Sequence, residues 1–120
     1  MENLSSTEKL FDLAILEAME DDEYTREMIS TYIADTPAEL KKMNSSLHQS
    51  STVELAKAAH KLKSSTAVFQ SGKLVGLLET IESLAKTGAV NKLKVVFEEI
   101  NSQYRALETG LKAQLRLLDK

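Results

Sequence analysis

One histidine in this 120-residue chain has a setting that suits phosphoryl chemistry. His60 lies in a segment with the spacing of an amphipathic helix, and at 100° per residue it points roughly 140° away from the centre of that helix's apolar stripe. An exposed imidazole is a nucleophile when one ring nitrogen keeps a free lone pair. The spacing therefore predicts a surface histidine that is open to a reacting partner.

Small residues surround this histidine along the same helix face. Ala56, Ser64 and Ala67 stand four residues before it, four after it and seven after it, where side chains on a helix lie above one another. Longer side chains at these positions would cover the ring. The pattern predicts a clearing in which another macromolecule can approach His60.

Three lysines, Lys57, Lys61 and Lys63, lie within about one helical turn of His60. Their charges can stabilise a phosphoryl group on the imidazole. Lys63 is the best placed, because its flexible ammonium can reach an anion bound at His60. A solvated lysine face explains the same charge pattern, so both interpretations stand at this point.

A glutamate on the following helix is level with His60. If the two helices form a hairpin that turns near residues 70 and 71, an equal rise per residue places Glu82 beside His60. Its carboxylate can accept a hydrogen bond from Nδ1, which fixes the tautomer and leaves the Nε2 lone pair free. The alternative is an ordinary solvent-facing glutamate.

The elements that must position these residues are helices. One proline, four glycines and many Leu, Ala, Glu and Lys favour helix, and no segment alternates like a strand. We expect an all-α fold, an antiparallel up-down-up-down bundle of four helices, because short connectors make sequential helices pack side by side. A short N-terminal helix would cap one end. The expected helices cover residues 10–18, 22–48, 52–70, 74–85 and 90 onward.

The longest expected segment, residues 22–48, contains Pro37. Proline inside a helix removes an amide donor and crowds the carbonyl of Ile33, four residues earlier. The apolar stripe keeps its phase on both sides of the proline, which favours one bent helix. Two helices that meet at residues 35–37 remain the alternative. Acidic residues 21–23 suit the start of this segment.

Composition excludes several kinds of function. A net charge of -3 gives no basic field for nucleic acid. The chain has no cysteine and two histidines far apart in sequence, so no metal site is indicated, and His48 is expected to be a surface residue without a role. No signal peptide or membrane span is indicated. We expect one domain, residues 1–120, in the cytoplasm.

The sequence around the histidine resembles a known family. Residues 59–65, Ala-His-Lys-Leu-Lys-Ser-Ser, followed by a Leu-rich helix, are similar to the motif of histidine-containing phosphotransfer (HPt) domains of two-component phosphorelays. The resemblance implies a four-helix bundle in which His60 accepts a phosphoryl group on Nε2 from a receiver-domain aspartyl phosphate and passes it to another receiver. It implies that Lys63 supports the phosphate, and that Glu82 stands where some members bond a glutamine to the ring.

Two residues depart from the family pattern. Ser64 stands where glycine is most common, beside the histidine, and Gln70 stands where a glycine often ends the helix. Ser64 is still small, and its hydroxyl can donate a hydrogen bond to phosphate. Its effect on transfer is open, and so is the end of the helix near Gln70.

The resemblance also implies the partners. These are response-regulator receiver domains and a hybrid sensor kinase, with the chain as a monomer that needs no cofactor of its own, since Mg²⁺ is expected in the receiver. No nucleotide site is present, so the chain is expected to be a phosphotransfer intermediate and not a kinase. Phe11, Ile15 and Met19 are candidates for the docking edge. The alternative function is a helical adaptor or oligomerisation module with an incidental histidine; a hydrolase is a remote third.

Overall fold

The computed structural model describes residues 11–119, in which the regular structure is helical and no strand is present. The predicted all-α class is confirmed. The described helices are α2 (Ala14–Glu17), α3 (Asp22–His48), α4 (Thr52–Ala67), α5 (Gly72–Ala85) and α6 (Val90–Leu118).

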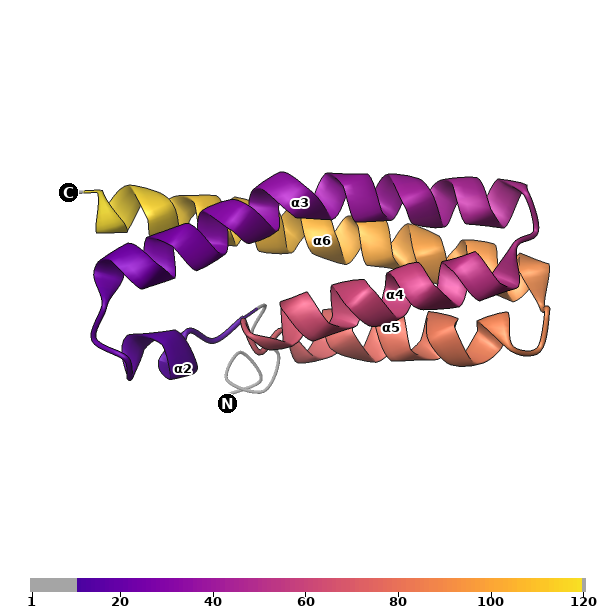
Figure 1. Cartoon of the computed structure of the whole chain (residues 1–120), viewed down its shortest axis with the longest axis horizontal. Coiled ribbons are helices and arrows are strands. Elements are labelled where there is room, and N and C mark those ends of the chain that lie inside the picture. Colours follow the sequence, from indigo (N-terminus) through magenta and orange to yellow (C-terminus); the bar gives the residue numbers. More distant parts are fainter. Residues whose placement is uncertain (1–10, 120) are drawn as a thin grey trace, which may run out of the picture.

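The four long helices lie side by side along the long axis of the molecule, and consecutive helices run in opposite directions (Figure 1). Helix α4 packs between α3 and α5, and α6 closes the ring by packing against both α3 and α5. The buried interior is mostly apolar, because each helix turns one stripe inward. Its fully buried large side chains include Ile29, Met43, Leu55, Leu62, Phe69, Leu74, Leu78, Ile81, Leu93, Ile100 and Leu107.

Helix α3 continues through Pro37, so the prediction of one helix is confirmed and the two-helix alternative is wrong. Its start is fixed by Asp21, whose side chain accepts a hydrogen bond from the backbone amide of Tyr24 at 3.0 Å. Just before the proline, the Thr36 hydroxyl donates to the Tyr32 carbonyl at 2.6 Å. The apolar stripe therefore stays in register along the whole helix.

The turn between α4 and α5 sets the relative level of the candidate site residues His60 and Glu82. Helix α4 ends at Ala67, three residues earlier than expected. Gln70 then adopts a φ of 52°, the left-handed conformation that glycine adopts most easily. This residue takes the backbone role of the glycine that the family pattern places here.

The N-terminal segment contacts the chain just after α4 and packs against α3. The backbone amide of Asp12 donates to the Phe69 carbonyl at 2.7 Å, and Leu13 and Leu16 are buried. The expected helix over residues 10–18 is shorter in the structure, since α2 covers Ala14–Glu17; residue 10 lies outside the described part.

Phe11, a candidate for the docking edge, is only partly exposed. Its ring packs against the core beside Gly110, where a Cβ would lie 2.7 Å from the ring. An aromatic side chain gains more from this burial than from exposure. Ile15 and Met19 remain 55% and 57% exposed.

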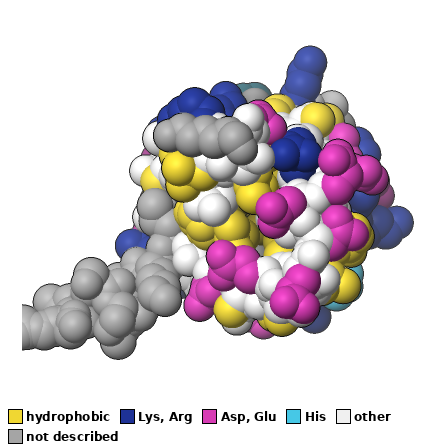
Figure 2. Space-filling model, turned by 90° about the vertical axis from the view of Figure 1, so that its left-hand side faces the viewer, with side chains coloured by type: hydrophobic (Ala, Val, Ile, Leu, Met, Phe, Trp, Pro, Cys, Tyr) yellow, Lys and Arg dark blue, Asp and Glu magenta, His cyan; other side chains and the backbone are white. Residues whose placement is uncertain are grey.

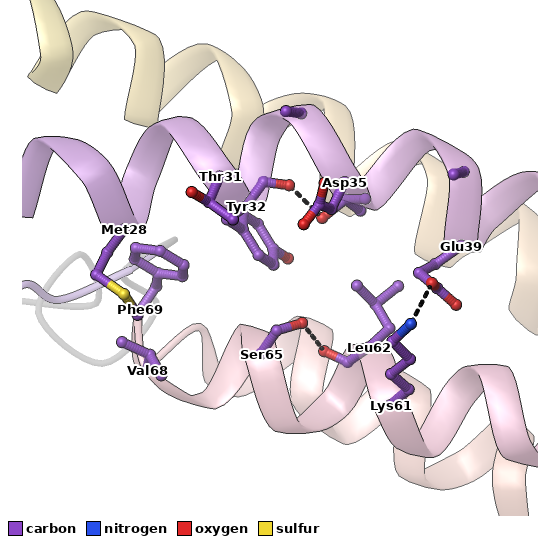
Figure 3. A pocket seen from close by; sticks show the side chains of 13 residues that line it. Met28, Thr31, Tyr32, Asp35, Glu39, Lys61, Leu62, Ser65, Val68 and Phe69 are labelled. Atoms are coloured by element: carbon purple, nitrogen blue, oxygen red, sulfur yellow. Dashed lines mark hydrogen bonds and ion pairs between the residues drawn. The ribbon is translucent and has the colours of Figure 1, made fainter.

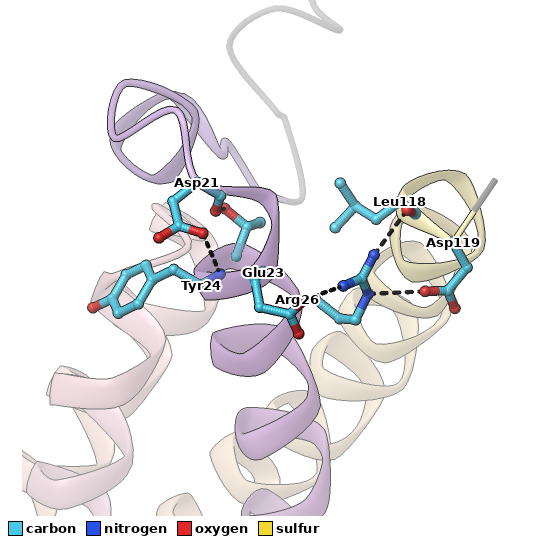
Figure 4. A network of polar contacts seen from close by, with 7 residues as sticks. Asp21, Glu23, Tyr24, Arg26, Leu118 and Asp119 are labelled. Carbon is cyan, nitrogen blue, oxygen red and sulfur yellow. Dashed lines mark hydrogen bonds and ion pairs between the residues drawn. The ribbon is translucent and has the colours of Figure 1, made fainter.

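A polar network joins the first turn of α3 to the end of α6 (Figure 4). Arg26 donates to the Asp119 carboxylate at 2.8 Å and to the Leu118 carbonyl at 2.9 Å, and it also pairs with Glu23 at 3.1 Å. The hydrogen bond to Asp119 raises the pKa of Arg26 against the opposing effect of desolvation. Figure 2 faces this end of the molecule and shows hydrophobic side chains in its middle, with Asp and Glu side chains to the right of them and below.

Candidate functional site

His60 projects from the middle of α4 with 61% of its side chain exposed. The neighbouring positions Ala59 and Leu62 are buried in the core, which fixes the rotation of α4 and turns His60 outward. The ring meets α5, where its Nδ1 lies 3.1 Å from Oε2 of Glu82. The structure therefore brings His60 and Glu82 together, as the hairpin geometry predicts.

The Glu82 carboxylate is shared between two partners. Its second oxygen, Oε1, accepts a hydrogen bond from Lys63 Nζ at 3.3 Å. Burial raises the pKa of Glu82, but the hydrogen bonds and charges of Lys63 and His60 outweigh it and lower the pKa overall. Glu82 is thus ionised at neutral pH. An ionised carboxylate only accepts hydrogen bonds, so the neutral ring carries its proton on Nδ1 and keeps the lone pair on Nε2.

Each of the three lysines around His60 is paired with glutamate. Lys57 Nζ lies 3.6 Å from Glu54 on the same helix, and Lys61 Nζ lies 3.0 Å from Glu39 on α3. Lys63 is the one of the three whose partner, Glu82, also contacts the ring. The positive charge around the site is therefore largely balanced, and Lys63 is the lysine that shares a partner with His60.

The small residues around His60 differ in their environment. Ser64 is exposed, and its hydroxyl donates to the His60 carbonyl at 3.2 Å, so the side chain lies along its own helix. Ala67 is exposed, whereas Ala56 is half-buried against the core. Because all three are small, no long side chain extends from these positions toward the ring.

A groove of about 480 Å³ lies on the other side of α4, between α4 and α3 (Figure 3). Lys61 and Glu39 are paired on its wall, and the rings of Tyr32 and Phe69 are in contact, tilted by 53° with their centroids 4.8 Å apart. The Tyr32 hydroxyl is 2.7 Å from the Thr66 hydroxyl. Burial raises the pKa of Tyr32 to about 12, and the hydrogen bond with Thr66 opposes this increase.

Glu39 is a polar residue of this region that sequence reasoning missed. Its side chain is only 11% exposed although it is charged, and it contacts both Lys61 and Lys42. It lies beside the apolar stripe of α3, and nothing in the local pattern distinguishes it from a solvent-facing glutamate. Its partner becomes visible only when α3 is placed against α4.

Three further features of the described residues concern His48, metal binding and the membrane. His48 is exposed in the last turn of α3. Within residues 11–119, no three His, Cys, Asp or Glu side chains gather as a candidate metal site. None of the described helices is long and apolar enough to cross a membrane.

Comparisons with known proteins identify the class of this helical fold. Residues 27–115 match the model of the Hpt domain, and the chain belongs to this family. Its structure is similar to the crystal structure of histidine-containing phosphotransfer protein B (HptB) from Pseudomonas aeruginosa PAO1, with a TM-score of 0.84 and 20% sequence identity over 90% of this chain and 96% of that one. A search of curated proteins finds no match.

Family membership gives the general function. Hpt domains take part in histidine phosphotransfer in two-component phosphorelays, as carriers and not as kinases, and they interact with receiver domains of response regulators. The site described above lies inside the matched region, as do both helices that form it.

Proposed function

We propose that His60 is the phosphoacceptor, and that it takes a phosphoryl group from the aspartyl phosphate of one receiver domain and passes it to another. The observation that carries this proposal is the contact between His60 Nδ1 and the Glu82 carboxylate at 3.1 Å on an exposed helix face. This contact holds the tautomer in which Nε2 is the nucleophilic atom.

The transfer step is a displacement at phosphorus. The Nε2 lone pair forms a bond to phosphorus while the bond from phosphorus to the aspartate oxygen breaks, and that electron pair returns to the aspartate as a carboxylate. No proton has to move, because Nε2 carries none in the tautomer that Glu82 favours. The reverse displacement, on a second receiver, regenerates neutral His60.

Two further residues assist in this proposal. Lys63 supports the phosphoryl group, for which its ammonium must exchange its contact with Glu82 for one with phosphate oxygens. Ser64 is the adjacent small residue that leaves the approach open. The Mg²⁺ ion that neutralises phosphate charge belongs to the receiver, and phosphoryl transfer from ATP is no part of the mechanism.

The proposal treats residues 1–120 as one domain, an antiparallel four-helix bundle with its N-terminal helix at one end, that acts as a monomer in the cytoplasm. Its partners are receiver domains, including that of a hybrid sensor kinase. They dock around His60, and the exposed side chains of Ile15 and Met19 are candidates for the edge of the contact.

A transfer assay tests the proposal. A panel of receivers carrying labelled aspartyl phosphate, with Mg²⁺, is incubated with the wild type and with His60→Gln. We expect an acid-labile phosphate on the wild type and none on the variant. Equal receiver binding with no label on either protein would instead support a helical adaptor with an incidental histidine.

A further inference from the structure

Glu82 presents a fixed acceptor to the Nδ1 side of the His60 ring. Its carboxylate is ionised, its pKa is lowered, and its two oxygens are occupied by Nδ1 of His60 and Nζ of Lys63. A neutral amide in this place can turn over and present either an acceptor or a donor. A carboxylate cannot, so it stabilises only those forms of the ring that keep a proton on Nδ1.

The phosphorylated ring is the form in which this difference matters most. With phosphorus on Nε2 and hydrogen on Nδ1, the ring carries one positive charge, which lies beside the negative charge of Glu82. If the Nδ1 proton left, a nitrogen lone pair would face a carboxylate oxygen about 3.1 Å away. Both terms, attraction in one form and repulsion in the other, favour the protonated ring.

The Nδ1 proton also decides how easily the phosphoryl group leaves. When the bond between Nε2 and phosphorus breaks, its electron pair returns to Nε2. A ring that is protonated on Nδ1 departs as neutral imidazole, whereas an unprotonated ring would have to depart as an imidazolate anion. The protonated form is therefore the competent donor.

We propose that Glu82 retains the Nδ1 proton on phosphorylated His60 and so keeps the phosphoryl group transferable to a receiver as the pH rises. This inference rests on the proposed phosphoacceptor role of His60 and deepens it. Glu82 acts here as a positioning residue, because it acts through the ring and touches neither phosphorus nor the receiver.

The other charged groups near the ring are accounted for by their own contacts. On α4, Lys57 is paired with Glu54, and Lys61 with Glu39 of α3. On α5, Glu79 reaches Lys63 at 4.0 Å. Lys63 lies near the ring on the Glu82 carboxylate in this structure, and on the phosphate oxygens in the proposed function, so in both states its positive charge opposes the effect of Glu82.

The direct test is a pH titration of the phosphorylated protein by ³¹P NMR. The wild type and Glu82→Gln are phosphorylated with phosphoramidate, and the phosphohistidine chemical shift is followed from acid to alkaline pH. Removal of an adjacent opposite charge lowers the titration midpoint of the ring by about one pH unit. Glu79→Gln is the matched control, one helical turn away on the same helix, and its midpoint should fall by much less.

Transfer kinetics supply the second readout. The rate at which each protein donates phosphate to a receiver is expressed relative to its own rate below both midpoints. Above them, Glu82→Gln should be slower by about tenfold, the factor that corresponds to one pH unit. Lys63→Met should move the NMR midpoint in the opposite direction, because the ammonium near the ring is lost while the carboxylate stays.

The outcomes separate this inference from the function on which it rests. If neither a phosphorylated receiver nor phosphoramidate labels the wild type, the phosphoacceptor role is wrong. If the wild type is labelled but Glu82→Gln keeps the same midpoint, or Lys63→Met lowers it, the role stands and the inference about Glu82 is overturned. Glutamine has the shape of glutamate, and thermal unfolding followed by circular dichroism checks that each variant is folded.

Discussion

The two sides of α4 carry the same kind of contact with different consequences. Toward α5, His60 meets Glu82 at 3.1 Å; toward α3, the next residue, Lys61, meets Glu39 at 3.0 Å. Both contacts cross to a neighbouring helix, and both place a basic group on α4 against a carboxylate. The separation of the two partners in sequence and the geometry of their contact therefore do not distinguish a candidate reactive site from a structural ion pair.

The chemistry of the basic group makes the difference. The Lys61 ammonium has no acceptor atom, so its contact with the nearly buried Glu39 can only hold two helices together. The imidazole of His60 has a second nitrogen, and fixing the proton on Nδ1 defines the reactivity of Nε2. The α3 side should therefore govern stability, and the α5 side should govern transfer.

Replacement of His60 should have the largest effect, and it should abolish transfer while leaving stability nearly unchanged. His60→Gln removes the nucleophile from an exposed position, so acid-labile labelling by phosphorylated receivers should fall below detection. Thermal unfolding should stay close to that of the wild type, because the side chain is 61% exposed. Residual acid-labile label on the variant would show that another residue accepts the phosphate.

The stability of the protein at alkaline pH tests the packing of Tyr32, which lies on the α3 side of α4. Burial raises its pKa to about 12 from an ordinary value of 10.0, so its contribution to stability is fully present below pH 10 and is lost as the pH rises from 10 to 12. Two pKa units correspond to about 2.7 kcal/mol. Unfolding by urea at several alkaline pH values should therefore show a smaller loss of stability for Tyr32→Phe than for the wild type.

Tyr32→Phe also has a fixed cost, since Thr66 loses its partner in a buried hydrogen bond. At neutral pH we expect about 1 kcal/mol lower stability. The free energy of unfolding of the variant should still fall somewhat as the pH rises, because burial also raises the pKa of Tyr104. If the free energy of unfolding falls with alkaline pH as steeply as in the wild type, burial does not raise the pKa of Tyr32. Phosphoryl transfer at neutral pH should change little.

Lys61→Met measures the structural contact itself. The variant leaves the Glu39 carboxylate with Lys42, at 3.8 Å, as its ion-pair partner, and we expect a loss of about 1 kcal/mol in the free energy of unfolding. Lys57→Met is the matched control, because the Lys57 pair with Glu54 is exposed and lies within one helix, so its loss should be near zero. Equal losses would mean that Glu39 is not stabilised by Lys61.

Much of the α5 side was predictable from the sequence. The helix periodicity places His60 outward, and the equal rise of two helices in a hairpin makes Glu82 level with it. The short connector between α4 and α5 leaves little freedom in their relative positions, so the His60 to Glu82 contact follows from counting residues. Gln70 changes the identity of the turn residue but adopts the left-handed backbone that the turn needs.

The α3 side was less predictable, for a physical reason. Whether Lys61 meets Glu39 depends on the rotation of α3 about its axis and on its crossing of α4, which the packing of the whole core decides. The same holds for Phe11, whose place beside Gly110 depends on a contact between residues about a hundred positions apart. Local patterns carry no information about either contact.

Ser64 gives the smallest expected effect and the finest test of the α5 side. Its hydroxyl donates to the His60 carbonyl of its own helix, so it is already held along the helix. Ser64→Ala removes the hydroxyl without adding backbone freedom, and the transfer rate should stay within about twofold of the wild type, less than 0.5 kcal/mol in the barrier. Single-turnover transfer from one receiver, compared at equal concentrations, measures this. A tenfold slower variant would mean that the hydroxyl turns to the phosphoryl group during transfer, and the serine would then assist the reaction.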